Sequence, residues 1–205
     1  MSTSQLGQDT AVVKFYKNKR DGYFLEIGAN DGLNLSNTYL LEKGYGWKGI
    51  CVEPIPAIFE KLVANRPNSH CCDNAVYNTS NETVTFDIAN NYTLLSGISA
   101  NIDSHTKAVN ANKTTISVKT ITLNDLLDKY SAPTFIEYLS LDTEGSEYEI
   151  LKSCDFTKYT IGLIDVEHNY VEPRRSHIKT LLLENGYVYI GENKWDDSYK
   201  HSSLT

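Results

Sequence analysis

Short apolar runs alternate along the chain with segments whose apolar residues recur every three or four positions. The first pattern is typical of buried strands and the second of amphipathic helices. The runs predict strands over residues 23–27, 47–52, 69–76, 117–118, 135–141, 160–166 and 187–191, a half-exposed strand over 82–88, and an antiparallel strand around Tyr199. The helical spacing predicts helices over residues 4–17, 57–65, 124–130, 147–153 and 174–185, and another that includes Tyr39 and Leu41.

Strands that alternate with helices indicate βαβ units, and therefore an α/β fold with a mostly parallel central sheet and helices on both faces. The periodicity fades over residues 90–113, where Ser, Asn and Thr dominate, so we expect a long mobile loop there. The chain of 205 residues contains no internal repeat and no long linker, which predicts one domain over residues 1–205 with an N-terminal helix within residues 1–20.

The net charge and the cysteine content restrict the possible binding partners and the expected compartment. The formal net charge is −7 and no dense basic run occurs, which argues against nucleic acid or an anionic membrane surface as a partner. The four cysteines form no C-x-x-C pair, so we expect free thiols in a reducing compartment. With no long apolar stretch, the expected location is the cytoplasm, or the host cytoplasm for a virus-encoded protein.

Acidic residues end several predicted strands, where open α/β sheets bind ligands. Glu53 ends the second strand, the position from which a carboxylate can accept hydrogen bonds from a ribose diol. The loop after the first strand reads EIGANDG (residues 26–32) rather than G-x-G-x-x-G, and its Glu26 and Asp31 would repel a pyrophosphate. A positively charged nucleoside fits better, and S-adenosylmethionine is such a ligand.

Individual roles follow from this ligand. Glu26 could bind its ammonium group, Gly28 would let the backbone approach the methionine part, and Asn30 could hydrogen-bond the carboxylate. Asp73 and Asn74 follow the third predicted strand and could contact the adenine edge.

Four motifs occur in a fixed order along the chain: GYFLEIGANDG (residues 22–32), GICVEP (49–54), YLSLDTEGSEYEIL (138–151) and VEHN (166–169). Together with the opening SQLGQD (4–9), they resemble the FkbM-type methyltransferases, and most closely members encoded by large algal viruses, where such domains modify glycans. The resemblance implies a Rossmann-like class I methyltransferase fold and methyl transfer from S-adenosylmethionine to hydroxyls, often on sugars. It also implies a cofactor or reaction cleft lined by Glu26, Gly28, Asn30, Glu53 and Asp142. We include their neighbours in the same motifs, Ala29, Asp31 and Pro54, in the predicted cofactor site.

The reaction needs a group that handles the proton of the acceptor hydroxyl. His168 follows a strand end beside Glu167, and an imidazole titrates near neutrality, so His168 is the first candidate for the base. Asp142 and Glu167 come from neighbouring strand ends and complete the candidate catalytic set. With His168 they could also bind a divalent cation such as Mg²⁺. Glu144, Tyr170 and Trp195 are candidates for binding the acceptor, the two aromatic rings by stacking on a sugar.

These observations predict an S-adenosylmethionine-dependent O-methyltransferase that acts on a sugar hydroxyl of a glycan, for example a deoxyhexose such as rhamnose, and that could form a homodimer. Two alternatives remain at this stage. One is an NAD-dependent sugar oxidoreductase, since Glu53 suits any adenosine ribose. The other is a glycan- or nucleotide-binding module without catalytic activity.

Overall fold

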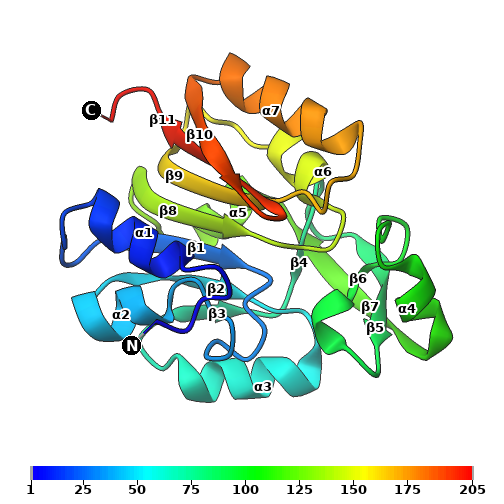
Figure 1. The fold of residues 1–205 in the computed structure, drawn as a ribbon. Helices are drawn as coiled ribbons and strands as arrows, with labels where there is room; N and C mark the ends of the chain where they lie inside the picture. Colours follow the sequence, from blue (N-terminus) through cyan, green and yellow to red (C-terminus); the bar gives the residue numbers. More distant parts are fainter. Residues whose placement is uncertain (1, 205) are drawn as a thin grey trace.

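A seven-stranded sheet forms the centre of the molecule in the computed structural model, which describes residues 2–204. Its strands follow the order β10-β11-β9-β8-β1-β2-β3 (Figure 1). Their bounds are β1 Tyr23–Ile27, β2 Lys48–Val52, β3 His70–Cys72, β8 Phe135–Leu141, β9 Thr160–Glu167, β10 Tyr187–Asn193 and β11 Asp196–His201. All pairs from β3 to β9 are parallel, and only β11 runs antiparallel to both neighbours. The predicted α/β architecture is confirmed.

Helices cover both faces of this sheet because its strands are apolar on both sides. On β1, Leu25 and Ile27 belong to one hydrophobic cluster, which includes side chains of α5, α6 and α7. Phe24 points to the other face and packs in a second cluster with side chains of α1, α2 and α3. The bounds of these helices are α1 Gln8–Phe15, α2 Tyr39–Tyr45, α3 Pro56–Asn65, α5 Leu123–Lys129, α6 Glu147–Lys152 and α7 Arg174–Glu184. The predicted N-terminal helix over residues 4–17 is thus shorter in the structure, where α1 begins at Gln8.

A second, four-stranded sheet was not predicted. It has the order β4-β7-β5-β6, with bounds β4 Ala75–Val76, β5 Thr83–Ala89, β6 Gly97–Ile98 and β7 Lys113–Ile121. The prediction of one strand over residues 69–76 is wrong, because β3 and β4 belong to different sheets. The prediction of a loop over 90–113 is also wrong, since the segment contains the 3-10 helix η1 (Thr93–Leu95), β6 and α4 (Thr106–Ala111). Its mobility stays a prediction, as does the single-domain organisation.

The order in which strands are added to the sheet reverses between β1 and β8. From β1 the sheet continues through β2 to β3, whereas from β8 it continues through β9 in the opposite direction. Such a switch point is where open α/β sheets form their ligand crevice. Gly28 is required here, because it adopts a left-handed φ of 85° and a Cβ on it would overlap the carbonyl oxygen of Asp142. The loop after β1 and the end of β8 are thereby held in close contact.

Candidate active site

A cavity of about 350 Å³ lies at the carboxyl ends of β1, β2, β8 and β9. Many of the predicted site residues line it: Glu26, Gly28, Ala29, Asn30, Glu53, Pro54, Asp142, Glu144, Glu167 and Trp195. The others lie outside its lining: Asp31, Asp73, Asn74, His168 and Tyr170. The structure thus brings most of the acidic strand ends together, as their positions in the sequence predicted.

Three carboxyl groups form the acidic centre of the cavity, which we call the acid triad: Asp142, Glu144 and Glu167. One carboxylate oxygen of each lies within 4.8 Å of the other two. Asp142 directly follows β8, and Glu167 is the last residue of β9, so the parallel pairing of these strands makes the two neighbours. Glu144 reaches the same point through a left-handed backbone turn with a φ of 58°.

Burial and mutual repulsion raise the pKa values of the acid triad. Desolvation, followed by the charge of Glu147, raises the pKa of Asp142 to about 7, although its side chain is accessible from the cavity. Desolvation and the charge of Asp142 raise the pKa of Glu144 to about 9. The same causes raise the pKa of Glu167 well above its ordinary value, and its buried Oε2 has no hydrogen-bond partner. At neutral pH Glu144 and Glu167 therefore hold protons, and Asp142 can take up or release one.

Glu147 and Arg174 support the triad from behind. Glu147 is fully buried, and its Oε1 accepts hydrogen bonds from the backbone N–H of Thr143 (2.8 Å) and of Gly145 (3.1 Å). Its Oε2 lies 3.0 Å from Nη1 of Arg174, which also lies 3.0 Å from Oδ2 of Asp103. Glu147 therefore shapes the turn after β8, and Arg174 joins this turn to the 90–113 segment.

Glu26 lines the cavity, but its carboxylate already has protein partners. It accepts hydrogen bonds from the hydroxyls of Ser36 (2.9 Å) and Thr38 (2.6 Å), and lies 3.3 Å from Nη1 of Arg66. Arg66 is completely buried and also pairs with Glu42 at 2.6 Å. This arrangement makes Glu26 a support for residues 36–38 and leaves it little capacity for the ammonium group that the sequence assigned to it.

Glu53 has the geometry expected of a carboxylate that accepts hydrogen bonds from ribose hydroxyls. Its carboxylate lines the cavity and accepts a hydrogen bond from the backbone N–H of Ile55 at 2.8 Å, while burial raises its pKa to about 7. Next to it, the apolar side chains of Ile55, Ala75, Phe86 and Ile98 form one hydrophobic cluster and also line the cavity. Such apolar walls suit a flat base such as adenine.

The remaining predicted contacts of this loop region have local roles. Asp31 accepts hydrogen bonds from the backbone N–H of Leu33 and of Asn34, which fixes the turn after β1. Asn74 donates to the carbonyl oxygen of Lys119 at 3.3 Å and so connects the two sheets, and Asp73 is exposed. Neither Asp73 nor Asn74 lines the cavity.

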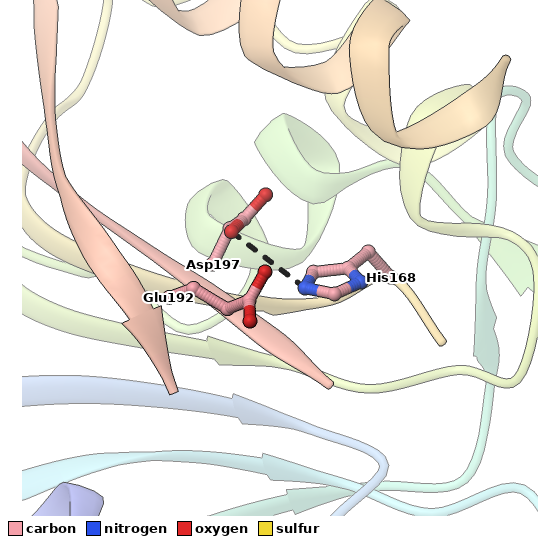
Figure 2. A group of neighbouring side chains, drawn as sticks. All are labelled: His168, Glu192 and Asp197. Carbon is pink, nitrogen blue, oxygen red and sulfur yellow. Dashed lines mark ion pairs between the residues drawn. The ribbon is translucent and has the colours of Figure 1, made fainter. Parts of the chain in front are cut away.

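His168 belongs to a different group, of which Figure 2 shows His168, Glu192 and Asp197. Its Nε2 lies 3.6 Å from Oδ1 of Asp197, and its Nδ1 accepts a hydrogen bond from the backbone N–H of Tyr170 at 2.9 Å. Arg175 donates to both oxygens of Asp197, at 2.8 and 2.7 Å, and to Glu192 at 2.6 Å. We call His168, Arg175, Glu192 and Asp197 the guanidinium group, because Arg175 supplies its positive charge.

The predicted combination of Asp142, Glu167 and His168 therefore requires correction. The acid triad takes Glu144 in place of the histidine, whose ring is 1% exposed and faces Asp197 rather than the cavity. Burial lowers the pKa of His168 despite the nearby carboxylate of Asp197. Tyr170 follows the histidine outward and is 57% exposed.

Several residues that line the cavity were not singled out from the sequence, among them Gln8, Asn37, His105, Ser140 and Asn169. Gln8, Ser140 and Asn169 lie inside recognised motifs, so their neighbourhood was the available signal. His105 had no such signal. It comes from the 90–113 segment, and its Nε2 lies 3.6 Å from Oε2 of Glu144.

Comparison with solved structures identifies the class of the fold. Precorrin-6y C5,15-methyltransferase from Geobacter metallireducens has 10% sequence identity and a TM-score of 0.50, with 93% of this chain and 84% of that chain covered. The METTL16 methyltransferase domain has 10% identity and a TM-score of 0.54, with 97% and 67% covered. The fold is therefore that of the class I methyltransferases.

The family is more specific than the fold. Residues 26–189 match the model of the methyltransferase FkbM domain, and the chain belongs to this family. It is accordingly a methyltransferase that uses S-adenosylmethionine, which favours the first prediction over the oxidoreductase. A search of curated proteins gave no match. Within residues 2–204, no helix combines the length and the apolar character needed to span a membrane.

The residues of the cavity fit S-adenosylmethionine. The carboxylate of Glu53 stands beside an apolar wall, as an adenosine group requires. On the other side of the switch point, the buried Oδ1 of Asn37 is an acceptor without a partner, and the cationic part of the ligand would satisfy it. The acidic lining also matches the positive charge of the sulfonium.

Proposed function

We propose that this methyltransferase acts on a hydroxyl group of a sugar residue in a glycan. The observation that carries the proposal is the acid triad of Asp142, Glu144 and Glu167 on the wall of the cavity. Carboxyl groups form hydrogen bonds with hydroxyls in either protonation state, as acceptors when ionised and as donors when protonated. A polyol presents several hydroxyls to such a group at once.

The proton of the acceptor hydroxyl passes to Asp142. When bound, S-adenosylmethionine would supply the methyl group from its positively charged sulfur, with S-adenosylhomocysteine as the leaving group. A neutral alcohol is a poor nucleophile for this displacement. A general base works best when its pKa lies near the working pH, and the pKa of Asp142 is about 7. Glu144 and Glu167, with their higher pKa values, keep their protons and orient the neighbouring hydroxyls. We therefore assign the base to Asp142 rather than to His168.

Apolar side chains at the cavity support a deoxyhexose such as rhamnose as the acceptor. Leu35 and Leu94 line the cavity and are 41% and 49% exposed. A deoxyhexose has a methyl group in place of one hydroxymethyl group, and such leucines would bury it favourably. A fully hydroxylated hexose would lose this contact.

The test measures methyl transfer to neutral glycosides. Purified protein is incubated with S-adenosylmethionine and methyl α-rhamnopyranoside or methyl α-mannopyranoside, and the methylated sugar is identified by mass spectrometry. We expect transfer to the rhamnoside in preference to the mannoside. Calorimetry with Glu53→Gln should show S-adenosylmethionine binding weakened by about 1–3 kcal/mol, through lost hydrogen bonds to a charged acceptor.

Binding of the methyl donor without transfer to any neutral glycoside or glycan would contradict the proposal, and would leave the binding-module alternative. Homodimer formation stays a prediction, which sedimentation velocity would check.

A further inference from the structure

The cavity has two ends of different chemistry. On the β2 side lie Glu53 and the apolar wall that suits an adenosine group. On the other side, β9 and β11 are neighbours in the sheet (Figure 1), and the lining consists of Glu167, Asn169, Trp195 and Asp196, together with Gln8 of α1. An aromatic ring beside amide and carboxyl groups is the combination that stacks on a sugar face and hydrogen-bonds its hydroxyls.

This polar end is held rigidly. Nε2 of Gln8 donates a hydrogen bond to Oδ2 of Asp196 at 2.7 Å, and both side chains are buried. The carbonyl oxygen of Trp195 accepts hydrogen bonds from the backbone N–H of His168 at 2.8 Å and of Asn169 at 3.4 Å. The hydrogen-bonding groups are thus positioned before any ligand arrives, which reduces the entropy lost on binding.

The polar end also contains an acceptor that no protein group satisfies. Oε2 of Glu167 has no hydrogen-bond partner, and the side chain is 7% exposed. A buried polar atom of this kind costs free energy unless a ligand or water pairs with it. A hydroxyl group of a bound sugar would donate to it.

The charge of the lining sets the class of sugar. Among the described residues that line the cavity, none is Lys or Arg, whereas seven are Asp or Glu. Lys194, whose Nζ lies 5.3 Å from the centre of the Trp195 ring, is outside this lining. Asp196 adds to the acids, with a pKa that burial raises to about 6, so it is largely ionised at neutral pH. Phosphate and carboxylate groups are normally bound by arginine, lysine or helix N-termini, and like charges oppose each other strongly in a confined site.

We propose that the acceptor binds at the β9–β11 end of the cavity, against Trp195, Asp196 and Asn169, and that it is an uncharged sugar residue. Sugar phosphates, nucleotide sugars and uronic acids are excluded. This inference rests on the proposed function and adds the place of the acceptor and its charge class. Methylation would therefore follow the transfer of the sugar onto a glycan, rather than precede it on a nucleotide-activated sugar.

The first experiment compares two acceptors that differ in charge. Initial rates are measured with methyl α-rhamnopyranoside and with rhamnose 1-phosphate at saturating S-adenosylmethionine. We expect kcat/KM for the phosphate to be lower by about 100-fold, because the lining offers it no positively charged partner and the carboxylate of Asp196 repels it. Equal rates for the two acceptors would overturn the inference and leave the proposed function standing. Transfer to neither, nor to any neutral glycan, would instead contradict the proposed function.

The second experiment locates the acceptor. Asp196→Asn should raise KM for the rhamnoside by about tenfold, the equivalent of one lost hydrogen bond to a charged group, with the Kd for S-adenosylmethionine unchanged. Glu184→Gln, an exposed change at the end of α7, is the matched control and should change neither value. A shift of the Kd for S-adenosylmethionine with no change in acceptor KM would place the methyl donor, not the acceptor, at this end. If Asp196→Asn fails to fold, the acceptor comparison on the unchanged protein still decides.

Discussion

The acid triad and the guanidinium group are both built at the end of β9, and they differ in what neutralises their carboxylates. In the guanidinium group, Arg175 contacts Asp197 and Glu192 at 2.6–2.8 Å and supplies a permanent positive charge. In the acid triad the carboxyl groups face each other and the cavity, and their pKa values are raised. A cluster of carboxylates that is paired with an arginine stabilises the fold. A cluster without such a partner can bind protons and ligands.

Glu26 follows the first pattern, although it lines the cavity. Arg66 and the hydroxyls of Ser36 and Thr38 satisfy its carboxylate, as Arg175 satisfies Asp197. Position at a strand end therefore does not separate a catalytic acid from a structural one. A paired arginine does separate the two kinds of acid. In both structural cases this arginine comes from a distant part of the sequence or from another element.

Asp142→Asn tests the triad most directly and should have the largest effect. An amide cannot accept the proton of the acceptor, so we expect turnover to fall by roughly 10²–10⁴-fold. His168→Gln is the matched change in the guanidinium group and should cause a much smaller loss. Both rates are measured by methyl transfer to the rhamnoside, with S-adenosylmethionine binding followed by calorimetry. The reverse order of the two losses would return the base to His168.

Removal of a buried cation should have the next largest effect, on stability. Arg66→Met leaves Glu26 and Glu42 buried without their partner, which should cost about 3–5 kcal/mol in the free energy of unfolding. Arg20→Met, at an exposed guanidinium, is the control and should cost little. Urea denaturation compares the two variants with the unchanged protein. A loss at Arg66 no greater than at Arg20 would refute the structural role assigned to this pair.

The triad also predicts a dependence of stability on pH. Because the folded protein raises the pKa of Glu144 from 4.5 to about 9, the folded state binds a proton more tightly than the unfolded state. Its contribution to stability is fully present below the unfolded pKa and is lost as the pH rises through the folded pKa. Unfolding free energies of the unchanged protein, relative to Glu144→Gln, should therefore decline between about pH 4 and pH 9. A difference that does not vary with pH would contradict the assignment.

Removal of divalent cations should have the smallest effect. Protons already neutralise part of the triad, so we expect no measurable change of turnover in excess EDTA. A Mg²⁺-dependent enzyme would instead lose activity and recover it when the ion is restored. That outcome would support the cation predicted from the sequence, with Glu144 in place of His168 among its ligands.

The sequence predicts those parts of the fold that depend on local pattern. The apolar runs that end at Ile27, Val52 and Leu141 are strands of the central sheet, and the acids after them meet because parallel strands end at one edge. Alternation at residues 82–88 likewise identified a strand. It could not show that this strand pairs with β6 and β7 in a separate sheet, because pairing partners depend on tertiary contacts.

The sequence predicted the acidic residues of the site but not the arginine residues that pair with some of them. Arg66 reads in the sequence as an exposed charge after a helix, and its partners Glu26 and Glu42 lie 40 and 24 positions away. His168 had a favourable position after a strand, but its ring lies against Asp197, which belongs to another element. Nor could polar composition at 90–113 reveal that η1 and His105 would line the cavity.

The contact between Gln8 and Asp196 joins residues separated by 188 positions, and β11 inserts between β9 and β10. This end of the cavity therefore depends on contact between α1 and β11, two elements far apart in the sequence. In the proposed arrangement, loss of β11 would remove Asp196 and with it one side of the acceptor end of the cavity.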